Sequence, residues 1–250
     1  MISISDEDLR LLANCTAGNG FLFDQIGAEC HGDAPCSDPT AAAVAKFILS
    51  RVRPEMVSAV LQQLRGASVM SSNAPAAPAQ LCLTMPTWLH PETFASSVAS
   101  TEVAMVNVIL HAKSGLKLAF PFIDAASRSL FKQLEYAWRR GCSVQILCRD
   151  FGKVESMGLG MDFENALTHS CDGAACRIPT FVGDDRWTFH AKVLIADEST
   201  AYVGSANLTK ASLADQAEVG ILVSDPAVLK DLRTWYSSLW SALVHAGSVR

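Results

Sequence analysis

His-Ala-Lys-Val-Leu-Ile-Ala-Asp-Glu-Ser-Thr-Ala-Tyr-Val-Gly-Ser-Ala-Asn, residues 190–207, has the polar skeleton H-x-K-x4-D-x6-G-S-x-N. At ordinary residue frequencies, a chain of this length contains that pattern by chance in roughly a few of every million cases. The pattern joins an imidazole, an ammonium, a hydroxyl and an amide, which together can bind and attack a phosphodiester. Its specified residues are His190, Lys192, Asp197, Gly204, Ser205 and Asn207.

Local sequence predicts how these side chains are presented. Apolar and β-branched residues over 187–196 indicate a strand, so His190 and Lys192, two residues apart, project from the same face. Residues 197–199 predict a turn, 200–203 a second strand, and Gly204 its end. Ser205 and Asn207 are good N-caps for a helix expected over 208–213, whose free N–H groups would seat a phosphate.

Each group in the pattern suits one role in phosphoryl transfer. A neutral imidazole at His190 can act as the nucleophile, and Lys192 would neutralise phosphate charge. Ser205 and Asn207 would hold the non-bridging oxygens, with Arg186 and Lys210 as flanking phosphate contacts. The acceptor expected to orient the imidazole is Glu218, which begins an alternating strand over 218–223.

Residues 190–207 resemble the active-site motif of the phospholipase D superfamily, often called the HKD motif, and Glu218 stands where that family commonly keeps an acidic residue. The resemblance implies a metal-independent transfer in two steps without a cofactor. One histidine attacks phosphorus to form a phosphohistidine, a second protonates the leaving alcohol, and water resolves the intermediate. It also implies that the lysine and asparagine bind phosphate and that Asp197 is structural, in the turn.

The chain has one such motif. His111-Ala112-Lys113 repeats its opening, but Leu118 stands where the aspartate would follow and no Gly-Ser-x-Asn comes after it. We therefore interpret His111 as a basic residue at a helix C-terminus. Small members of the resembled family bring two copies of the motif together by homodimerisation. We thus expect a homodimer in which two His190 side chains share one site across a two-fold axis.

Composition sets broader bounds. Half of the 250 residues are hydrophobic, which is enough for a substantial core, and the net charge is −5. That charge argues weakly against a protein that coats long nucleic acids, but a nuclease needs only a local positive field. No run of about twenty apolar residues occurs and the N-terminus lacks the pattern of a signal peptide, so we expect a cytoplasmic protein with no membrane partner. The eight cysteines form no C-x-x-C pair, and we expect free buried thiols rather than a metal site.

The order of elements predicts two regions. Helices expected over 5–15, 40–50 and 54–65, an irregular stretch over 18–39 and a linker over 67–80 give a helical N-terminal region and linker, residues 1–75. Strand and helix patterns then alternate over residues 76–250, which indicates an α/β fold with a mixed sheet flanked by helices. The phospholipase-D-like resemblance covers roughly residues 81–245 of this second region. Its expected strands are 81–85, 116–122, 143–148 and 177–182; its expected helices are 91–113, 125–140, 161–170 and 227–246.

Three classes of function remain open from the sequence. The first is a phosphodiesterase that acts on DNA or RNA as a nuclease, favoured because single-motif members of the resembled family are mostly nucleases. The second is a non-catalytic nucleic-acid-binding subunit, and the third is a phospholipase or phosphatidyl transferase. Size, single motif and helical extension also resemble the phospholipase-D-like component of anti-phage defence systems of the DISARM type. That resemblance implies other defence-system proteins as partners.

Overall fold

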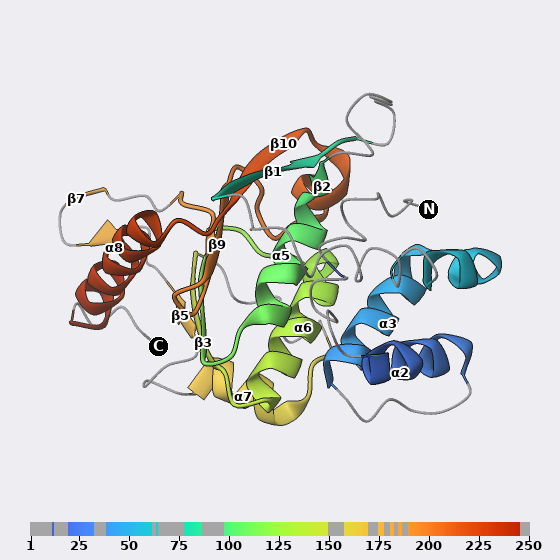
Figure 1. The fold of residues 1–250 in the computed structure, drawn as a ribbon. Helices are drawn as coiled ribbons and strands as arrows, with labels where there is room; N and C mark the ends of the chain where they lie inside the picture. Colours follow the sequence, from blue (N-terminus) through green and yellow to red (C-terminus); the bar gives the residue numbers. More distant parts are fainter. Residues whose placement is uncertain are drawn as a thin grey trace.

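The computed structural model describes residues 12, 20–32, 39–61, 64, 78–86, 98–149, 158–169, 175–177, 181–182, 185–186 and 190–245. Within this part of the chain, an eight-stranded sheet runs in the order β2-β1-β10-β9-β8-β3-β4-β5 (Figure 1). Its strands are β1 Ala79–Thr84, β2 Ala99–Ser100, β3 Gly115–Ala119, β4 Ser143–Cys148, β5 Ala175–Arg177, β8 Val193–Ala196, β9 Thr200–Gly204 and β10 Glu218–Val223. A separate pair joins β6, Phe181–Val182, to β7, Asp185–Arg186.

The sheet is mixed, as the sequence predicted. Neighbours from β1 through β10, β9 and β8 to β3 are antiparallel, whereas β3, β4 and β5 are parallel. The antiparallel run β8-β9-β10 is a continuous meander, because these strands follow one another in the chain and pair in that order. Parallel neighbours need a longer crossover, and the helices between β3, β4 and β5 supply it.

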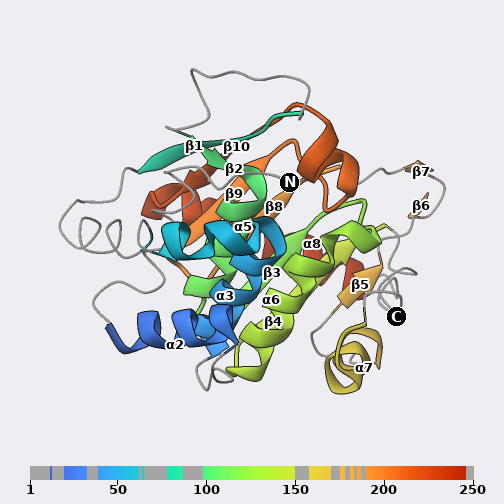
Figure 2. The ribbon, with the colours of Figure 1, turned by 90° about the vertical axis from the view of Figure 1, so that its right-hand side faces the viewer.

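Helices cover both faces of the sheet (Figures 1 and 2). On one face lie α5, Thr101–His111, and α6, Arg128–Arg139, preceded by the short helix η2, Ala125–Ser127. Residues 101–110 of α5 are all buried, since the helix packs between the sheet and other helices. The last helix, α8, Pro226–His245, covers the opposite face. Two further helices of the described core region are α7, Met161–His169, and the short π-helix η4, Ala211–Asp215.

Alternation along the central strands divides the core into two layers. Leu116, Leu118, Leu194 and Tyr202 belong to the large apolar cluster on the α5 and α6 face. The residues between them point to the other side, where Ala119, Val193, Ile195 and Ala201 pack with Leu229 and Tyr236 of α8. Central strands that are apolar on both faces are typical of a sheet sandwiched between helices.

Two N-terminal helices join the larger core. They are α2, Gly20–His31, and α3, Pro39–Arg51, followed by a short helix η1, Pro54–Met56. Ile26 of α2 and Val44 and Ile48 of α3 are fully buried in the same apolar cluster as α5 and α6. The prediction of an irregular stretch over 18–39 is therefore wrong for residues 20–31, because α2 gains its stability from packing on α3. The helix expected over 5–15 lies outside the described residues, apart from Leu12, and the division at residues 75 and 76 stays a prediction.

Within the core region several expected elements differ from the observed ones only at their ends, but the helix expected over 91–113 is wrong at residues 99–100, which form β2 and pair with β1. The strands predicted at 143–148 and 218–223 coincide with β4 and β10. The strand predicted over 187–196 begins at Val193, because pairing with β9 starts there. The strand predicted over 177–182 is wrong, since residues 175–177 and 181–182 belong to two different sheets. No helix of the described residues is long and apolar enough to cross a membrane.

Candidate active site

The motif residues gather at one end of the meander β8-β9-β10. Lys192 immediately precedes β8, Gly204 ends β9 and Glu218 begins β10, and in antiparallel neighbours these positions fall at the same edge. The backbone N–H of Gly204 donates to the carbonyl oxygen of Lys192 at 3.2 Å, which aligns the two strands at this edge. The sheet therefore brings residues 28 positions apart, 190 and 218, to a single edge.

An exposed imidazole and a buried ammonium group form the centre of this edge. The Nζ of Lys192 lies 2.9 Å from Nδ1 and 3.0 Å from Nε2 of His190, and donates to the His190 carbonyl oxygen at 2.9 Å. Lys192 is only 6% exposed, whereas His190 is exposed. Burial lowers the pKa of Lys192, and the charge of Glu218 partly opposes that shift. An anion that approached His190 would therefore meet a cation that has few waters of its own.

Ser205 links the end of β9 to the start of β10. Its Oγ donates to Oε2 of Glu218 and accepts from the N–H of Val219 at 3.1 Å. Its backbone N–H donates to the Val219 carbonyl oxygen at 2.9 Å. Within the described residues, no hydrogen bond joins Glu218 to His190. Glu218 thus holds the Ser205 hydroxyl in this structure, and its expected role in orienting His190 stays a prediction.

The helix expected over 208–213 begins later than predicted, so Ser205 and Asn207 do not cap it. The chain instead forms a five-residue π-helix, Ala211–Asp215, whose N-cap is Lys210 without a side-chain cap. Residue 208 is held as an extended bridge, because Leu208 N–H donates to the Phe122 carbonyl and the Leu208 carbonyl accepts from Asp124 N–H. The proposed phosphate seat at a helix N-terminus is therefore absent at 205–207.

Asn207 nevertheless keeps a feature of a binding residue. Its Oδ1 atom is buried and has no hydrogen-bond partner in the part of the chain that the structure describes. A buried polar atom without a partner costs free energy, of the order of 1–3 kcal/mol. Such an atom suits a position whose partner arrives with a ligand or a second subunit.

Gly204 is a glycine because a tyrosine ring covers it. Gly204 pairs with Gly220 across β9 and β10, and the side chain of Tyr202 extends over both positions. A Cβ atom at either glycine would collide with that ring, and at Gly204 it would also lie 2.8 Å from the Val219 carbonyl oxygen. Tyr202 is fully buried, so the ring cannot easily move away. The glycine thus serves close packing behind the site.

Asp197 lies at the far end of β8, in the turn to β9. Its backbone is left-handed, with φ of 53°. Its carboxylate accepts four hydrogen bonds: from the N–H groups of Lys113, Ser114 and Gly115 at 2.8–2.9 Å and from the Ser114 hydroxyl at 2.7 Å. Burial raises the pKa of Asp197, but these hydrogen bonds lower it by more, so it stands below its ordinary value. The aspartate thereby ties the β8–β9 turn to the start of β3.

The two flanking cations are not brought into this cluster by the described contacts. Arg186 belongs to β7, outside the main sheet, and its side chain lies outside the described residues. Lys210 is exposed, with its Nζ 3.7 Å from the Asp215 carboxylate, and its N–H donates to Asp124. Among the described residues, no group of three or more His, Cys, Asp or Glu side chains is arranged to hold a metal ion.

Sequence reasoning missed three supports of the site. Thr84 of β1 pairs directly with Glu218, and its Oγ1 is buried without a partner in the described chain. Asp124 holds residues 208–210 through the N–H groups of Asp124 and Lys210, and Tyr202 covers the two glycines. Only Tyr202 lies within the motif, so motif spacing could not have found the other two.

His111 ends α5, and its Nδ1 lies 2.9 Å from the Asn107 carbonyl oxygen of the preceding turn. This position at a helix C-terminus is the one that the sequence predicted for it. Four cysteines, Cys30, Cys82, Cys142 and Cys148, are free thiols in the described chain.

Curated relatives are similar to part of the chain. Phospholipase D Z of Dictyostelium discoideum is 30% identical over 116 residues, which are 46% of this chain and 26% of that protein. Phospholipase D Y of the same organism is 43% identical over 54 residues, 21% of this chain and 12% of that protein. The matched segments thus span about a quarter or less of these relatives.

Solved structures also resemble the chain. NucT from Helicobacter pylori has 17% identity and a TM-score of 0.47, covering 65% of this chain and 96% of that one. Nuc from Salmonella typhimurium, a phospholipase D family member, has 21% identity and a TM-score of 0.47, covering 69% and 95%. The profile of the family described as "Cardiolipin synthase, PLD-like domain" matches residues 105–240, more than half of the chain. With its single motif at the edge of a mixed sheet, the chain belongs to this family of phospholipase-D-like domains.

Proposed function

We propose that this chain is a metal-independent phosphodiesterase that cleaves nucleic acid, acting as a nuclease through a phosphohistidine on His190. One observation carries the proposal. The exposed imidazole of His190 lies against the buried ammonium group of Lys192, whose Nζ is 2.9–3.0 Å from both ring nitrogens. This ammonium attracts the phosphate that the ring attacks.

Two steps account for hydrolysis. A ring nitrogen of His190 donates its electron pair to phosphorus, and the bond from phosphorus to the leaving oxygen breaks as a protonated second imidazole gives that oxygen its proton. Water then gives a proton to the second imidazole and attacks phosphorus, and the phosphorus–nitrogen bond breaks. Lys192 would stabilise the charge on the non-bridging oxygens in both steps, aided by Asn207 and by the hydroxyl of Ser205. Glu218 would hold that hydroxyl in place.

The second imidazole is His190 of the partner subunit. The chain has one motif, and a two-fold axis places identical side chains opposite each other. Because Lys192 precedes β8 at the sheet edge and His190 is exposed there, a second copy can approach the ring without displacing the core. The homodimer, the anti-phage role and a cytoplasmic location remain predictions.

A phospholipid substrate is the second candidate, favoured by the names of the matching family and of the curated relatives. Nucleic acid is placed first because the chain has a single motif, as do the nucleases of the resembled family. The two candidates separate in one pair of assays: cleavage of end-labelled DNA and RNA, and release of headgroups from phospholipid vesicles.

The decisive experiment measures cleavage in excess EDTA by the wild-type chain and by His190→Ala. We expect the variant to lose activity by at least about a thousandfold, because the nucleophile is gone. His31→Ala, which removes an exposed histidine from the end of α2, is the matched control and should cleave normally. Retention of activity by His190→Ala would refute the mechanism, and an active monomer in light scattering would refute the shared site.

A further inference from the structure

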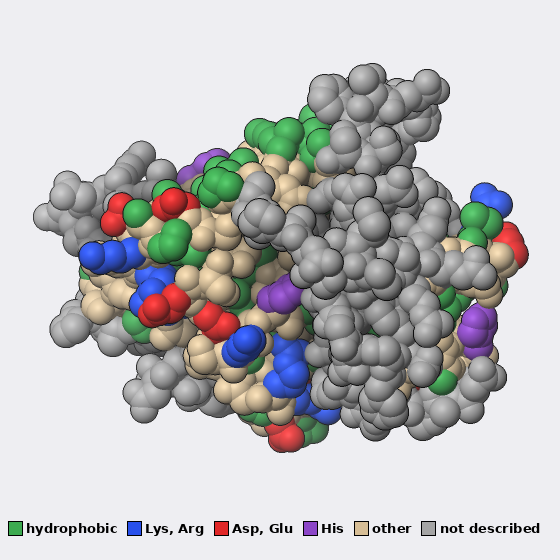
Figure 3. Space-filling view, viewed as in Figure 1, with side chains coloured by type: hydrophobic (Ala, Val, Ile, Leu, Met, Phe, Trp, Pro, Cys, Tyr) green, Lys and Arg blue, Asp and Glu red, His purple; other side chains and the backbone are tan. Residues whose placement is uncertain are grey.

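A second polar site lies on α8, toward the end of β8 that is opposite His190. An open hollow of about 610 Å³ is formed where this helix meets β3. Its walls carry cations and hydroxyl groups, and we call it the α8 hollow: Lys117, Lys230, Arg233, Thr234, Ser237, Ser238 and Ser241. Lys and Arg side chains are visible over α8 in the space-filling view (Figure 3).

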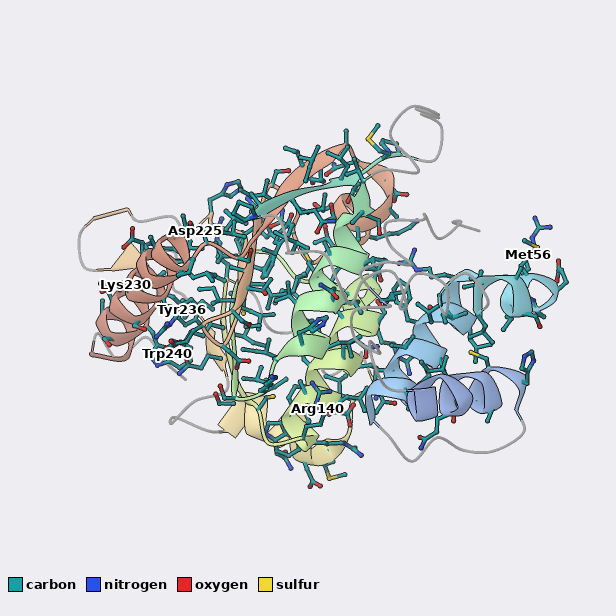
Figure 4. The ribbon with its side chains drawn as sticks, viewed as in Figure 1. Met56, Arg140, Asp225, Lys230, Tyr236 and Trp240 are labelled. Atoms are coloured by element: carbon teal, nitrogen blue, oxygen red, sulfur yellow. The ribbon has the colours of Figure 1, made fainter. Side chains whose placement is uncertain are left out.

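The α8 residues of the hollow form one stripe of the helix. Positions 230, 233, 234, 237, 238 and 241 recur at intervals of three and four, so they lie on one side. A neighbouring stripe that includes Leu229 and Tyr236 packs on the sheet, and Figure 4 shows Lys230 and Tyr236 on the helix beside it. The polar stripe therefore flanks the buried one, at the seam between helix and sheet.

Lys117 supplies the floor of the hollow from the sheet. It lies in the middle of β3 and pairs with Ile195 of β8, whose side chain belongs to the layer under α8. Its Nζ lies 3.5 Å from the Ser237 hydroxyl and 5.8 Å from the centre of the Tyr236 ring. A lysine in the centre of a sheet that otherwise buries apolar residues on this face is unusual for packing alone.

The charges in the hollow do not balance. The residues that line it include three cations and no carboxylate, and the partner of Arg233, Glu198, is itself 75% exposed. The chain as a whole carries a net charge of −5, so this concentration of positive charge is local. Burial and the charge of Arg233 lower the pKa of Lys117, whereas Glu198 raises it. An anion between Lys117 and Arg233 would relieve their repulsion.

We propose that the α8 hollow binds backbone phosphates of a nucleic acid strand, at a site separate from the one where the strand is cut. Lysine, arginine and hydroxyl side chains are the common protein partners of such phosphates, and an open hollow admits a continuing chain. The hollow faces the α8 side of the sheet, near the β8–β9 turn, while His190 lies at the other end of β8. The inference rests on the proposed nucleic-acid substrate and adds a second place where that substrate is held.

The test measures binding without cleavage. A labelled single-stranded oligonucleotide, long enough to reach both sites, is titrated by fluorescence anisotropy with chains that all carry His190→Ala. The variants Lys230→Gln and Lys230→Gln/Arg233→Gln remove charges from the surface of α8 with a residue that favours helix. The matched control is Arg53→Gln/Lys113→Gln, which removes two exposed charges elsewhere. Thermal melting checks that each variant folds.

We expect the affinity to fall about 4- to 6-fold for one lost phosphate contact at 0.15 M salt and about 14- to 30-fold for two, from the salt dependence of such contacts. The slope of log affinity against log salt should fall by about 0.7–0.9 per contact. The control should change little, and a dinucleotide too short to reach the hollow should bind all variants alike.

Three results would overturn the inference: equal affinities for the double variant and its control, no binding of the oligonucleotide at all, or an effect seen only with vesicles of anionic phospholipid. Cleavage by the chain with His190 intact is measured separately. If that chain does not cleave but the oligonucleotide binds in the way expected for the α8 hollow, the proposed function is refuted and the inference about the hollow is not. If that chain cleaves but the α8 variants bind like their control, only the inference about the hollow is refuted.

Discussion

Substitution of Asp197 tests whether this aspartate has a structural role or a catalytic one. The carboxylate accepts four hydrogen bonds from residues 113–115, all of them exposed or half-buried. At about 0.5–1 kcal/mol each in competition with water, they contribute about 2–4 kcal/mol. Alanine also tolerates the left-handed backbone poorly, at a cost of about 1–2 kcal/mol. We therefore expect Asp197→Ala to lower the free energy of unfolding by about 3–6 kcal/mol.

Asp197→Asn is the sharper variant. Asparagine tolerates the φ of 53° and keeps one side-chain oxygen, and in the wild type Oδ1 accepts three of the four bonds. Only the bond from Lys113 N–H to Oδ2 is lost, so the expected cost is about 1 kcal/mol. Urea unfolding, followed by circular dichroism, measures both variants, and phosphodiesterase turnover of the folded Asn variant should stay near that of the wild type.

The stabilisation of the fold by the Asp197 carboxylate depends on pH over a defined range. Because the folded-state pKa of Asp197 lies below its ordinary value of 3.8, the ionised carboxylate stabilises the fold fully above that value. This contribution is lost as the pH falls through the lower, folded-state pKa. The protonated side chain of Asp197 is then uncharged, as is the amide of the Asn variant. The stability difference between wild type and Asn should therefore narrow at strongly acid pH. Equal costs for Ala and Asn, or loss of turnover in a stable Asn variant, would refute this reasoning.

Further predictions concern the site itself. Gly204→Ala should destabilise the chain by about 1–3 kcal/mol in urea unfolding, because the new methyl group meets the buried Tyr202 ring, whereas Gly27→Ala, with open space around it in α2, should be neutral or stabilising. The lowered pKa of Lys192 predicts that kcat/KM falls at alkaline pH with a midpoint below 10.5. The variant Lys192→Arg should no longer show this alkaline fall in kcat/KM. Glu218→Gln should lower turnover with little change in nucleic-acid binding, and equal losses in both would argue against a positioning role.

The sequence was sufficient where local pattern determines structure. Apolar residues at 143–148 and alternation at 218–223 define β4 and β10, and residue spacing alone brings His190 next to Lys192. These features depend on strand period and on short turns, which neighbouring residues specify.

The sequence was insufficient where distant contacts override local preference. Residue 208 was expected to begin a helix, but backbone hydrogen bonds from Leu208 to Phe122 and Asp124, 84–86 positions away, hold it in an extended bridge. Gly20 to His31 suggested an irregular segment, yet burial of Ile26 against α3 makes it helical. The contact of Glu218 with Ser205 rather than with His190 likewise depends on how β9 pairs with β10.

In the meander β8-β9-β10, each strand pairs with the strand that follows it in the sequence, so the paired residues are close along the chain. The connections over residues 197–199 and 205–217 are shorter than the crossover over residues 120–142 that joins the parallel neighbours β3 and β4, so closing them costs less chain entropy. The motif residues carried by β8, β9 and β10 should consequently come together early during folding. In native-state hydrogen exchange, their amides should open together as one cooperative unit, separate in stability from the parallel half of the sheet.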